Sequence, residues 1–284
     1  MLICLKPTDK QTNIDLLFTM IAYIHLLLQQ TSKQNQQRCK PVGRDFKFEY
    51  VFMKIIICLL FMFMTISAIA QDDQMKTDWA NLKKYSAANI QLGLPGNKEH
   101  RVVFMGNSIT EYWRAYDSSF FINNGYIDRG ISGQTTPQML IRFRPDVINL
   151  KPSVVVILAG INDIAENTGP ISLENIFGNI VSMIELAEAS KIKVVVCSVL
   201  PASAFPWRPQ IKPAEKVVAL NGMLSYYCKE RHIVYVDYYS NMVNEEKGLD
   251  KKYTRDGVHP NLDGYKVMEP LVEEGIKKAL GKKK

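Results

Sequence analysis

Short, nearly continuous apolar runs are the feature that most constrains the fold of this chain. Four of them lie at 102–105 (VVFM), 154–159 (VVVILA), 193–199 (KVVVCSV) and 233–236 (IVYV). Apolar residues side by side, rather than in alternation with polar ones, are typical of strands covered on both faces, as in a parallel sheet. A weaker fifth run, at 126–131, reads YIDRGI. The sequence therefore predicts five strands.

Helical patterns separate these predicted strands. They cover 136–143, 172–190 and 214–231, and another over about Trp79 to Asn89 precedes the first strand. A last helix over 262–280 should be kinked or divided by Pro270, because proline lacks the N–H that an interior helical position donates. Strand and helix in alternation predict a three-layer α/β/α domain around a largely parallel sheet.

The segment before this domain has the order of a secretory signal peptide. Residues 53–70 begin with Met-Lys, continue through an apolar run and end in an A-x-A pattern at Ala70. The apolar run is too short to span a bilayer comfortably. We therefore expect cleavage after Ala70, no stable membrane anchor afterwards, and a periplasmic or secreted protein of the bacterial envelope. An uncleaved signal anchor is the alternative.

Residues 1–52 need a separate explanation, because a signal peptide normally starts a chain. We expect translation to begin at Met53, with residues 1–52 an extension of the gene prediction. The alternative is a membrane-associated leader with two apolar segments. Residues 71–284 then form one domain, which is long enough for a sizeable core.

Charge and cysteine content exclude several classes of protein. The net charge is +7, but residues 1–70 hold 8 Lys or Arg and 4 Asp or Glu, so residues 71–284 carry only +3. They contain no basic stripe with interleaved aromatic residues, and we expect no nucleic-acid partner. Cys197 and Cys228 alone make neither a disulfide framework nor a metal-binding pattern. We expect no metal and no cofactor.

Four segments with unusual residues should gather at one edge of the sheet, beyond the carboxyl ends of the strands, where ligands of such folds bind. They read GNSIT (106–110), RGISGQTT (129–136), AGIND (159–163) and RDGVHPN (255–261).

Together these segments contain what acyl transfer requires: a nucleophile, a base, a group that orients the base, and donors for an oxyanion. Ser108 stands at a strand-to-helix turn, and His259 follows Asp256 by three residues. Gly130 offers a backbone N–H and Asn162 a side-chain amide.

Each of these residues, taken singly, also has a purely structural interpretation. Ser108 could be a helix N-cap, Asn162 a turn residue, and Gly130 a backbone requirement. Their order along one predicted edge favours the catalytic interpretation.

The four segments resemble the sequence blocks of the SGNH hydrolases, also called GDSL-type esterases and lipases, over roughly 102–271. The resemblance implies a flavodoxin-like α/β/α fold with a parallel five-stranded sheet, and a metal-independent serine esterase. It makes Ser108 the nucleophile, His259 the general base and acid, and Asp256 the residue that orients His259. It also implies an oxyanion hole formed by the N–H groups of Ser108 and Gly130 and by the Asn162 side chain. The first block reads Gly-Asn-Ser where the family commonly has Gly-Asp-Ser, and the G-x-S-x-G of α/β-hydrolases is absent.

The substrate is predicted from the loop at 200–216, which should rim the same edge. Trp207 could offer a flat apolar surface and Arg208 a cation, and Tyr253 could add to the pocket. Packing of the loop is the alternative role for Trp207. Exported single-domain members of this family resemble carbohydrate acetylesterases and platelet-activating-factor acetylhydrolase-like proteins. We therefore expect a small acyl ester, above all acetyl, on a glycan.

Two other functions stay open at this point. The first is a lysophospholipase or thioesterase that acts on fatty-acyl chains. The second is a non-catalytic glycan-binding protein, against which the complete set of catalytic residue types argues. A nucleotide-binding protein is disfavoured because neither G-x-G-x-x-G nor a P-loop occurs.

Overall fold

The computed structural model of the chain describes residues 55–56, 77–97 and 99–281. All of these except residues 55 and 56 belong to one unit of the chain, Ala70–Lys284. The predicted extension, 1–52, and almost all of the predicted signal peptide, 53–70, lie outside the described residues. In the part that is described, no helix combines the length and the apolar character needed to cross a membrane.

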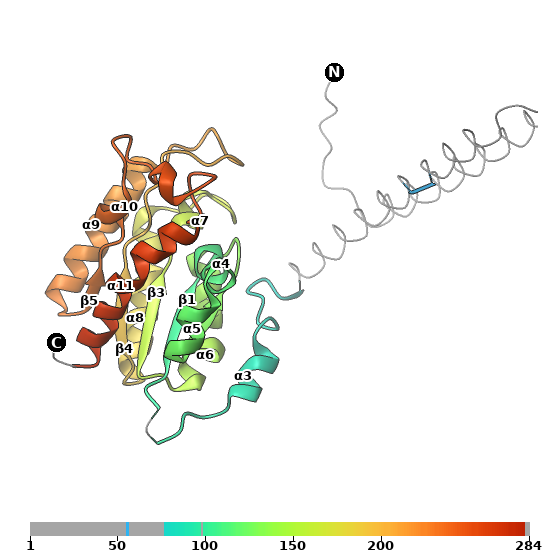
Figure 1. The fold of residues 1–284 in the computed structure, drawn as a ribbon, viewed down its shortest axis with the longest axis vertical. Helices are drawn as coiled ribbons and strands as arrows, with labels where there is room; N and C mark the ends of the chain where they lie inside the picture. The colour runs from blue at the N-terminus through green and yellow to red at the C-terminus, as the bar shows by residue number, and fades with distance from the viewer. Residues whose placement is uncertain (1–54, 57–76, 98, 282–284) are drawn as a thin grey trace, which may run out of the picture. The chain divides into compact units, whose positions relative to one another are not determined.

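The centre of the domain is a five-stranded sheet in which every pair of neighbours is parallel (Figure 1). Its order is β2-β1-β3-β4-β5, the flavodoxin-like order in which the ligand crevice lies between β1 and β3. The predicted fold class is therefore confirmed. The strands are β1 (Val102–Gly106), β2 (Tyr126–Gly130), β3 (Val154–Leu158), β4 (Lys193–Cys197) and β5 (Val234–Val236).

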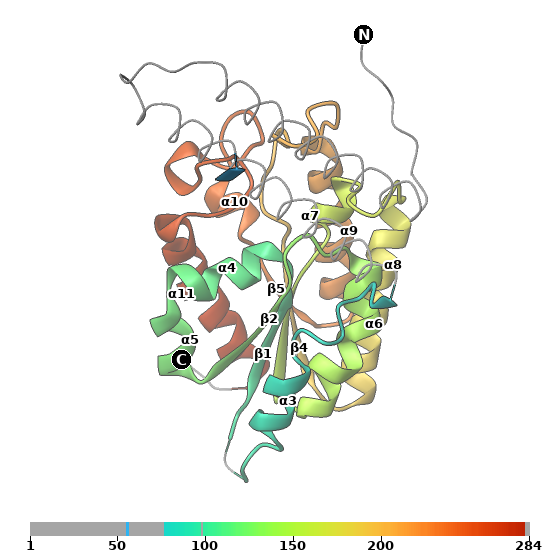
Figure 2. The ribbon, with the colours of Figure 1, turned by 90° about the vertical axis from the view of Figure 1, so that its right-hand side faces the viewer.

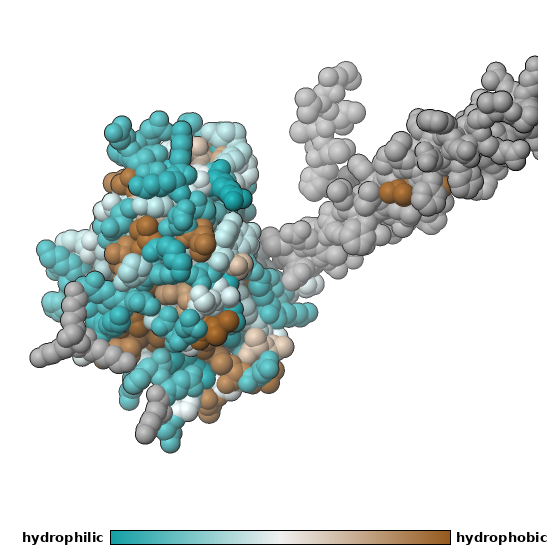
Figure 3. Space-filling view, in the orientation of Figure 1, coloured by the Kyte–Doolittle hydropathy of each residue, from teal (hydrophilic) through white to brown (hydrophobic). Residues whose placement is uncertain are grey.

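Helices cover both faces of the sheet, as Figure 2 shows. One layer contains α4 (Ser108–Tyr116), α5 (Ser118–Asn124) and α11 (Leu262–Ala279), and the other α6 (Thr136–Asp146), α8 (Leu173–Ala189) and α9 (Ala214–Glu230). The shorter elements are α3 (Ser86–Leu92), η1 (Ile148–Leu150), α7 (Ile161–Ile164), α10 (Tyr239–Met242) and η2 (Lys251–Tyr253). On the face drawn in Figure 3, hydrophobic residues form small groups between hydrophilic ones.

Burial explains why the apolar runs are continuous. All five residues of β1 and all five of β3 are buried, because these strands lie inside the sheet and helices cover both of their faces. Each fully buried aliphatic side chain contributes about 1.5–3 kcal/mol relative to an exposed one. The same burial leaves polar residues to the loops after the strands, where the site lies.

The helix expected at 79–89 forms only in part, as α3 (Ser86–Leu92). The residues before it make turns, and Asn81 adopts a positive φ of 54°, which no helix contains. Two backbone carbonyls in this stretch accept hydrogen bonds from elsewhere: Trp79 from the Gln138 side chain and Ala80 from the Gln134 side chain. Long-range contacts have replaced the local helical ones.

Of the two outcomes expected at Pro270, a kink or a division of the last helix, the division does not occur. Helix α11 continues from Leu262 to Ala279 with Pro270 inside it. An interior proline costs a helix about 3 kcal/mol. Met268, Val272 and Ile276 lie on the buried face of α11, and this packing against the sheet outweighs that cost.

Gly275 tests how closely α11 approaches the sheet. A Cβ at this position would lie 2.6 Å from Val236 Cγ2, so Gly275→Ala should lower the free energy of unfolding by about 1–3 kcal/mol through overpacking. The matched control is Gly178→Ala in α8, where a Cβ would meet nothing within 4 Å. It should raise stability by about 0.5–1 kcal/mol, because alanine is the better helix former. Urea unfolding of the purified protein measures both, and equal effects would contradict the packing argument.

Candidate active site

Ser108 is the first residue of α4 and follows β1 after a single turn residue. The turn is held by Asn107, whose side chain accepts a hydrogen bond from the Ile109 N–H at 3.0 Å. Gly106 is required there for space, since a Cβ would lie 2.0 Å from Thr110 Oγ1. This close turn places Ser108 beyond the carboxyl end of β1 and at the N-terminus of α4, which is the positive end of the helix dipole.

His259 lies in a tight loop between η2 and α11. The Thr254 hydroxyl donates to the His259 carbonyl at 2.7 Å and accepts from the Gly257 N–H at 3.0 Å. Gly257 has a φ of 82°, a conformation that favours glycine. Asp256 Oδ1 accepts the N–H groups of Val258 and His259 at 2.9 and 2.8 Å. The D-x-x-H spacing is therefore the spacing of one self-contained turn.

The structure brings the three predicted triad residues into one hydrogen-bonded chain. Ser108 Oγ lies 2.9 Å from His259 Nε2, and His259 Nδ1 lies 2.6 Å from Asp256 Oδ2. Burial raises the pKa of Asp256, but hydrogen bonds from the His259 ring and from two backbone N–H groups outweigh it, so the pKa lies below its ordinary value. An ionised Asp256 favours the imidazole tautomer with its proton on Nδ1, which leaves Nε2 able to accept from Ser108.

Asn162 and Asp163 lie in α7, immediately beyond β3. Asn162 is buried, and its amide donates one N–H to the Gln134 carbonyl at 3.0 Å. A side-chain amide has a second N–H to offer. Asp163 instead accepts the backbone N–H and hydroxyl of Thr136, and burial raises its pKa to about 6. Asp163 thus joins α7 to the start of α6.

Gly130 does not have the free N–H predicted for an oxyanion donor. Its N–H donates to Asp128 Oδ1 at 2.7 Å, and a Cβ at Gly130 would lie 2.3 Å from the Glu111 backbone nitrogen. Gly130 is needed for close packing of β2 against α4. Gly133, in the same loop, is exposed and has a φ of 76°. Among the described residues, no group accepts a hydrogen bond from the Gly133 N–H.

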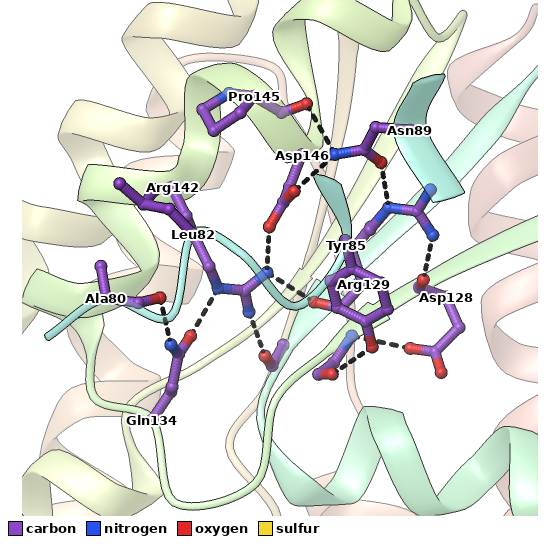
Figure 4. A network of polar contacts seen from close by, with 12 residues as sticks. Ala80, Leu82, Tyr85, Asn89, Asp128, Arg129, Gln134, Arg142, Pro145 and Asp146 are labelled. Atoms are coloured by element: carbon purple, nitrogen blue, oxygen red, sulfur yellow. Dashed lines mark hydrogen bonds and ion pairs between the residues drawn. The ribbon is translucent and has the colours of Figure 1, made fainter. Parts of the chain in front are cut away.

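The buried guanidinium of Arg142 joins the ends of β1 and β2 (Figure 4). It donates to the carbonyls of Gly106 at 2.8 Å and Arg129 at 2.9 Å, and its Nε donates to the Gln134 side chain at 2.5 Å. An ion pair with Asp146, 3.0 Å away, balances its charge. Arg142 therefore fixes the residues just before Ser108 and the loop that contains Gly133.

The segment before β1 is bound to the same network. The Tyr85 hydroxyl donates to the Gly130 carbonyl at 2.5 Å, and the Tyr85 ring lies 4.7 Å from the Arg129 guanidinium. Asn89 accepts from Arg129 Nε at 2.9 Å and donates to Asp146 at 2.8 Å (Figure 4). No local sequence pattern indicated this layer of contacts, because its partners lie 40 or more positions apart in the chain.

Of the predicted substrate residues, Trp207 has its ring beside that of His259. Its ring is 44% exposed, with a centroid 6.2 Å from that of His259. Tyr112, 40% exposed, has its ring centroid 5.4 Å from the His259 centroid. Arg208 is half-buried in the same loop as Trp207. Tyr253 supports the His259 loop instead, because its carbonyl accepts the Asn261 N–H at 2.7 Å.

Over the described part of the chain, no three side chains of His, Cys, Asp or Glu are grouped closely enough to hold a metal ion. The chemistry available at this edge is that of a hydroxyl, an imidazole, a carboxylate and amide donors. Those groups form the minimum set for nucleophilic acyl transfer.

Comparison with known proteins shows the family to which the chain belongs. Residues 104–267 match the model of the GDSL-like lipase/acylhydrolase family. The chain belongs to this family of ester hydrolases. The family predicted from the four sequence blocks is therefore confirmed.

Two crystal structures from Bacteroides are similar over nearly their whole length. One is a protein from Bacteroides fragilis assigned as an acylhydrolase, with 55% identity, a TM-score of 0.71, and coverage of 72% of this chain and 99% of that one. The other is a GDSL-like lipase from Bacteroides thetaiotaomicron, with 54% identity, a TM-score of 0.70, and coverage of 71% and 100%.

More distant proteins share parts of the chain or only the fold. An acetylxylan esterase from Geobacillus stearothermophilus has 17% identity and a TM-score of 0.52, covering 62% of this chain and 94% of that one. An uncharacterized lipoprotein, YqeF, from Bacillus subtilis is 27% identical over 134 residues. The match spans 46% of this chain and about half the length of that curated relative, 46%.

Arg142→Lys tests the junction between the two strands. An ammonium cannot reach both carbonyls and the Gln134 side chain, so buried acceptors lose their donor and the free energy of unfolding should fall by on the order of 3 kcal/mol. Arg144→Lys, at an exposed position of the same helix, is the matched control and should change stability by less than about 0.5 kcal/mol. Urea unfolding compares them, and equal stability of the two variants would refute the role given to Arg142.

Proposed function

We propose that this ester hydrolase is an exported serine esterase that removes small acyl groups, above all acetyl, from carbohydrate. The observation that carries the mechanism is the continuous chain from Ser108 Oγ through the His259 ring to Asp256, with distances of 2.9 and 2.6 Å. A serine that only capped a helix would not need an imidazole on one side of its hydroxyl and a carboxylate behind that imidazole.

In the first half of the reaction, Ser108 Oγ attacks the ester carbonyl while His259 Nε2 takes the hydroxyl proton. Asp256 stabilises the imidazolium that forms. The carbonyl oxygen becomes an oxyanion, for which we assign three donors: the Ser108 N–H, the second N–H of Asn162, and the Gly133 N–H. Gly133 replaces Gly130 because the Gly130 N–H already donates to Asp128. The intermediate collapses as His259 protonates the leaving alcohol oxygen, and the C–O bond to the alcohol breaks.

The second half repeats these steps with water. His259 takes a proton from water, the resulting hydroxide attacks the acyl-enzyme carbonyl, and the same three donors hold the oxyanion. Ser108 leaves as the proton returns to its oxygen, and the carboxylic acid is released. No step needs a metal or a cofactor.

Two features support a carbohydrate ester as the substrate. The exposed rings of Trp207 and Tyr112 beside His259 offer flat surfaces, which suit the apolar face of a sugar ring. The fold is shared with an acetylxylan esterase, which makes an acetylated glycan the first substrate to test, by analogy of fold.

The proposal that the protein is exported rests on the signal-like sequence of residues 53–70. Cleavage after Ala70 would leave Gln71 as the first residue, six residues before the first described residue of the domain, Thr77. N-terminal analysis of protein recovered from the periplasm or medium of its natural source should therefore begin at Gln71. A mature protein that retains residues 1–52 would overturn the proposed start at Met53 and the proposed cleavage.

Hydrolysis of p-nitrophenyl acetate, butyrate and octanoate tests the proposed reaction. We expect a preference for acetate, and a loss on the order of 10⁴-fold or more in kcat for Ser108→Ala. The control is Ser190→Ala, at the exposed C-terminal end of α8, which should keep full activity.

The other results of this experiment separate the alternatives. A preference for octanoate would favour a fatty-acyl hydrolase. Negligible rates in wild type and Ser108→Ala on all three esters would favour a glycan-binding protein without turnover.

A further inference from the structure

A hollow of about 360 Å³ lies between the segment before β1 and the loop after β2. Its first wall is 78–81, which we name the N-terminal arm; its second is 131–134, and its third is Asn167 with Thr168. The volume is within the range of small-molecule binding sites, about 300–1,000 Å³. None of the triad residues lines this hollow.

The hollow shares a wall with the proposed oxyanion hole. The loop 131–134 contains Gly133, whose carbonyl accepts from the Asn167 side chain at 3.2 Å. The next carbonyl along, that of Gln134, accepts from Asn162 at 3.0 Å. A ligand in the hollow therefore touches the loop that contains one of the three proposed oxyanion donors, Gly133, and that accepts a hydrogen bond from a second, Asn162.

Most of the residues that line the hollow are polar. The indole of Trp79 is 39% exposed, and hydroxyl and amide groups come from Ser132, Asn167 and Thr168. Ile131 is the one aliphatic residue in the lining set. A fatty-acyl chain needs continuous apolar walls, whereas a sugar presents a C–H face to an indole and hydroxyls to polar side chains.

The arm is held in place before any ligand arrives. The Trp79 and Ala80 carbonyls accept from Gln138 and Gln134, both at 2.7 Å. The Asp78 carboxylate accepts the N–H groups of Leu82 and Lys83 at 2.8 and 3.0 Å. A preformed wall adds little ordering cost to binding.

We propose that this hollow is a sugar-binding subsite, in which the Trp79 indole packs against a sugar unit of the substrate while its ester carbonyl lies at the oxyanion donors. The proposal rests on the esterase function proposed above. It adds a substrate class, an oligosaccharide rather than a single sugar or a lipid, and assigns its recognition to the N-terminal arm.

Two substrates separate recognition from chemistry. Acetylated xylo-oligosaccharide would fill the hollow, whereas p-nitrophenyl acetate has no sugar to place there. Trp79→Ala should lower kcat/KM on the oligosaccharide about tenfold or more, mainly through KM, and change kcat/KM on p-nitrophenyl acetate less than twofold. Tyr226→Ala is the matched control, because Tyr226 is an exposed aromatic residue of α9, outside the hollow. It should change neither value.

A second variant fills the hollow without shortening the arm. Thr168 is exposed at the rim, and Thr168→Lys would place a longer side chain across the space. It should reproduce the selective loss on the oligosaccharide. Calorimetric titration of Ser108→Ala with xylotriose should detect binding that is lost when Trp79→Ala is added.

The outcomes distinguish this inference from the proposed function. No hydrolysis of either substrate by the wild type would refute the esterase function itself. The wild type could hydrolyse both substrates while Trp79→Ala lowers kcat/KM equally on the oligosaccharide and on p-nitrophenyl acetate. That result would refute the subsite and would show that the N-terminal arm only supports the loop 131–134. Unchanged kinetics in both Trp79→Ala and Thr168→Lys would equally overturn the subsite.

Discussion

The arrangement of the site depends on one buried guanidinium. Strand β1 leads to Ser108, and β2 leads to the loop that contains Gly133. Arg142 donates to the Gly106 carbonyl at the end of β1 and to the Arg129 carbonyl at the end of β2. The strand order alone brings the carboxyl ends of β1 and β2 together. Beyond those ends, however, backbone carbonyls have no strand partner and need other hydrogen-bond donors. A planar group with five N–H donors meets several such carbonyls in one fixed geometry, so it also fixes the distance between the proposed nucleophile and the proposed oxyanion donors.

Three carboxylates of this region, Asp256, Asp128 and Asp163, have different environments and therefore different pKa values. Asp256 accepts two backbone N–H groups and the His259 ring, which holds its pKa below the ordinary value. Burial raises the pKa of Asp128 and of Asp163 to about 6, although each accepts a backbone N–H. Asp256 therefore stays charged, as the proposed mechanism requires of the group that stabilises the imidazolium. Asp128 and Asp163 lose their protons only as the pH rises toward neutrality, and their ionised forms then oppose folding.

Short-range sequence patterns were enough for the strands and for the pair of Asp256 and His259. The pairing of His259 with Ser108, 151 positions away, was indicated by the order of the four segments along one predicted edge and by the family resemblance. Continuous apolar runs located the strands, and the D-x-x-H turn is local, so its geometry followed from spacing alone. The choice between Gly130 and Gly133 could not be made this way, because it depends on Asp128 and on the approach of Glu111 from α4. The N-terminal arm gave no local signal, since its carbonyls are bound by residues more than fifty positions away.

Arg142 is different, because its signal was present in the sequence. Met139, Arg142, Phe143 and Asp146 recur at the three- and four-residue spacing of one helical face, and all four are buried. A charged pair four residues apart within an otherwise buried stripe costs desolvation that only a specific network recovers. A buried Arg–Asp pair of this kind therefore indicates a place where backbone carbonyls need hydrogen-bond donors. In this fold that place is the edge of the sheet where the proposed nucleophile and oxyanion donors lie. Arg142 also binds Gln134, whose side chain donates to the Ala80 carbonyl of the N-terminal arm, so the same network reaches the proposed sugar-binding subsite.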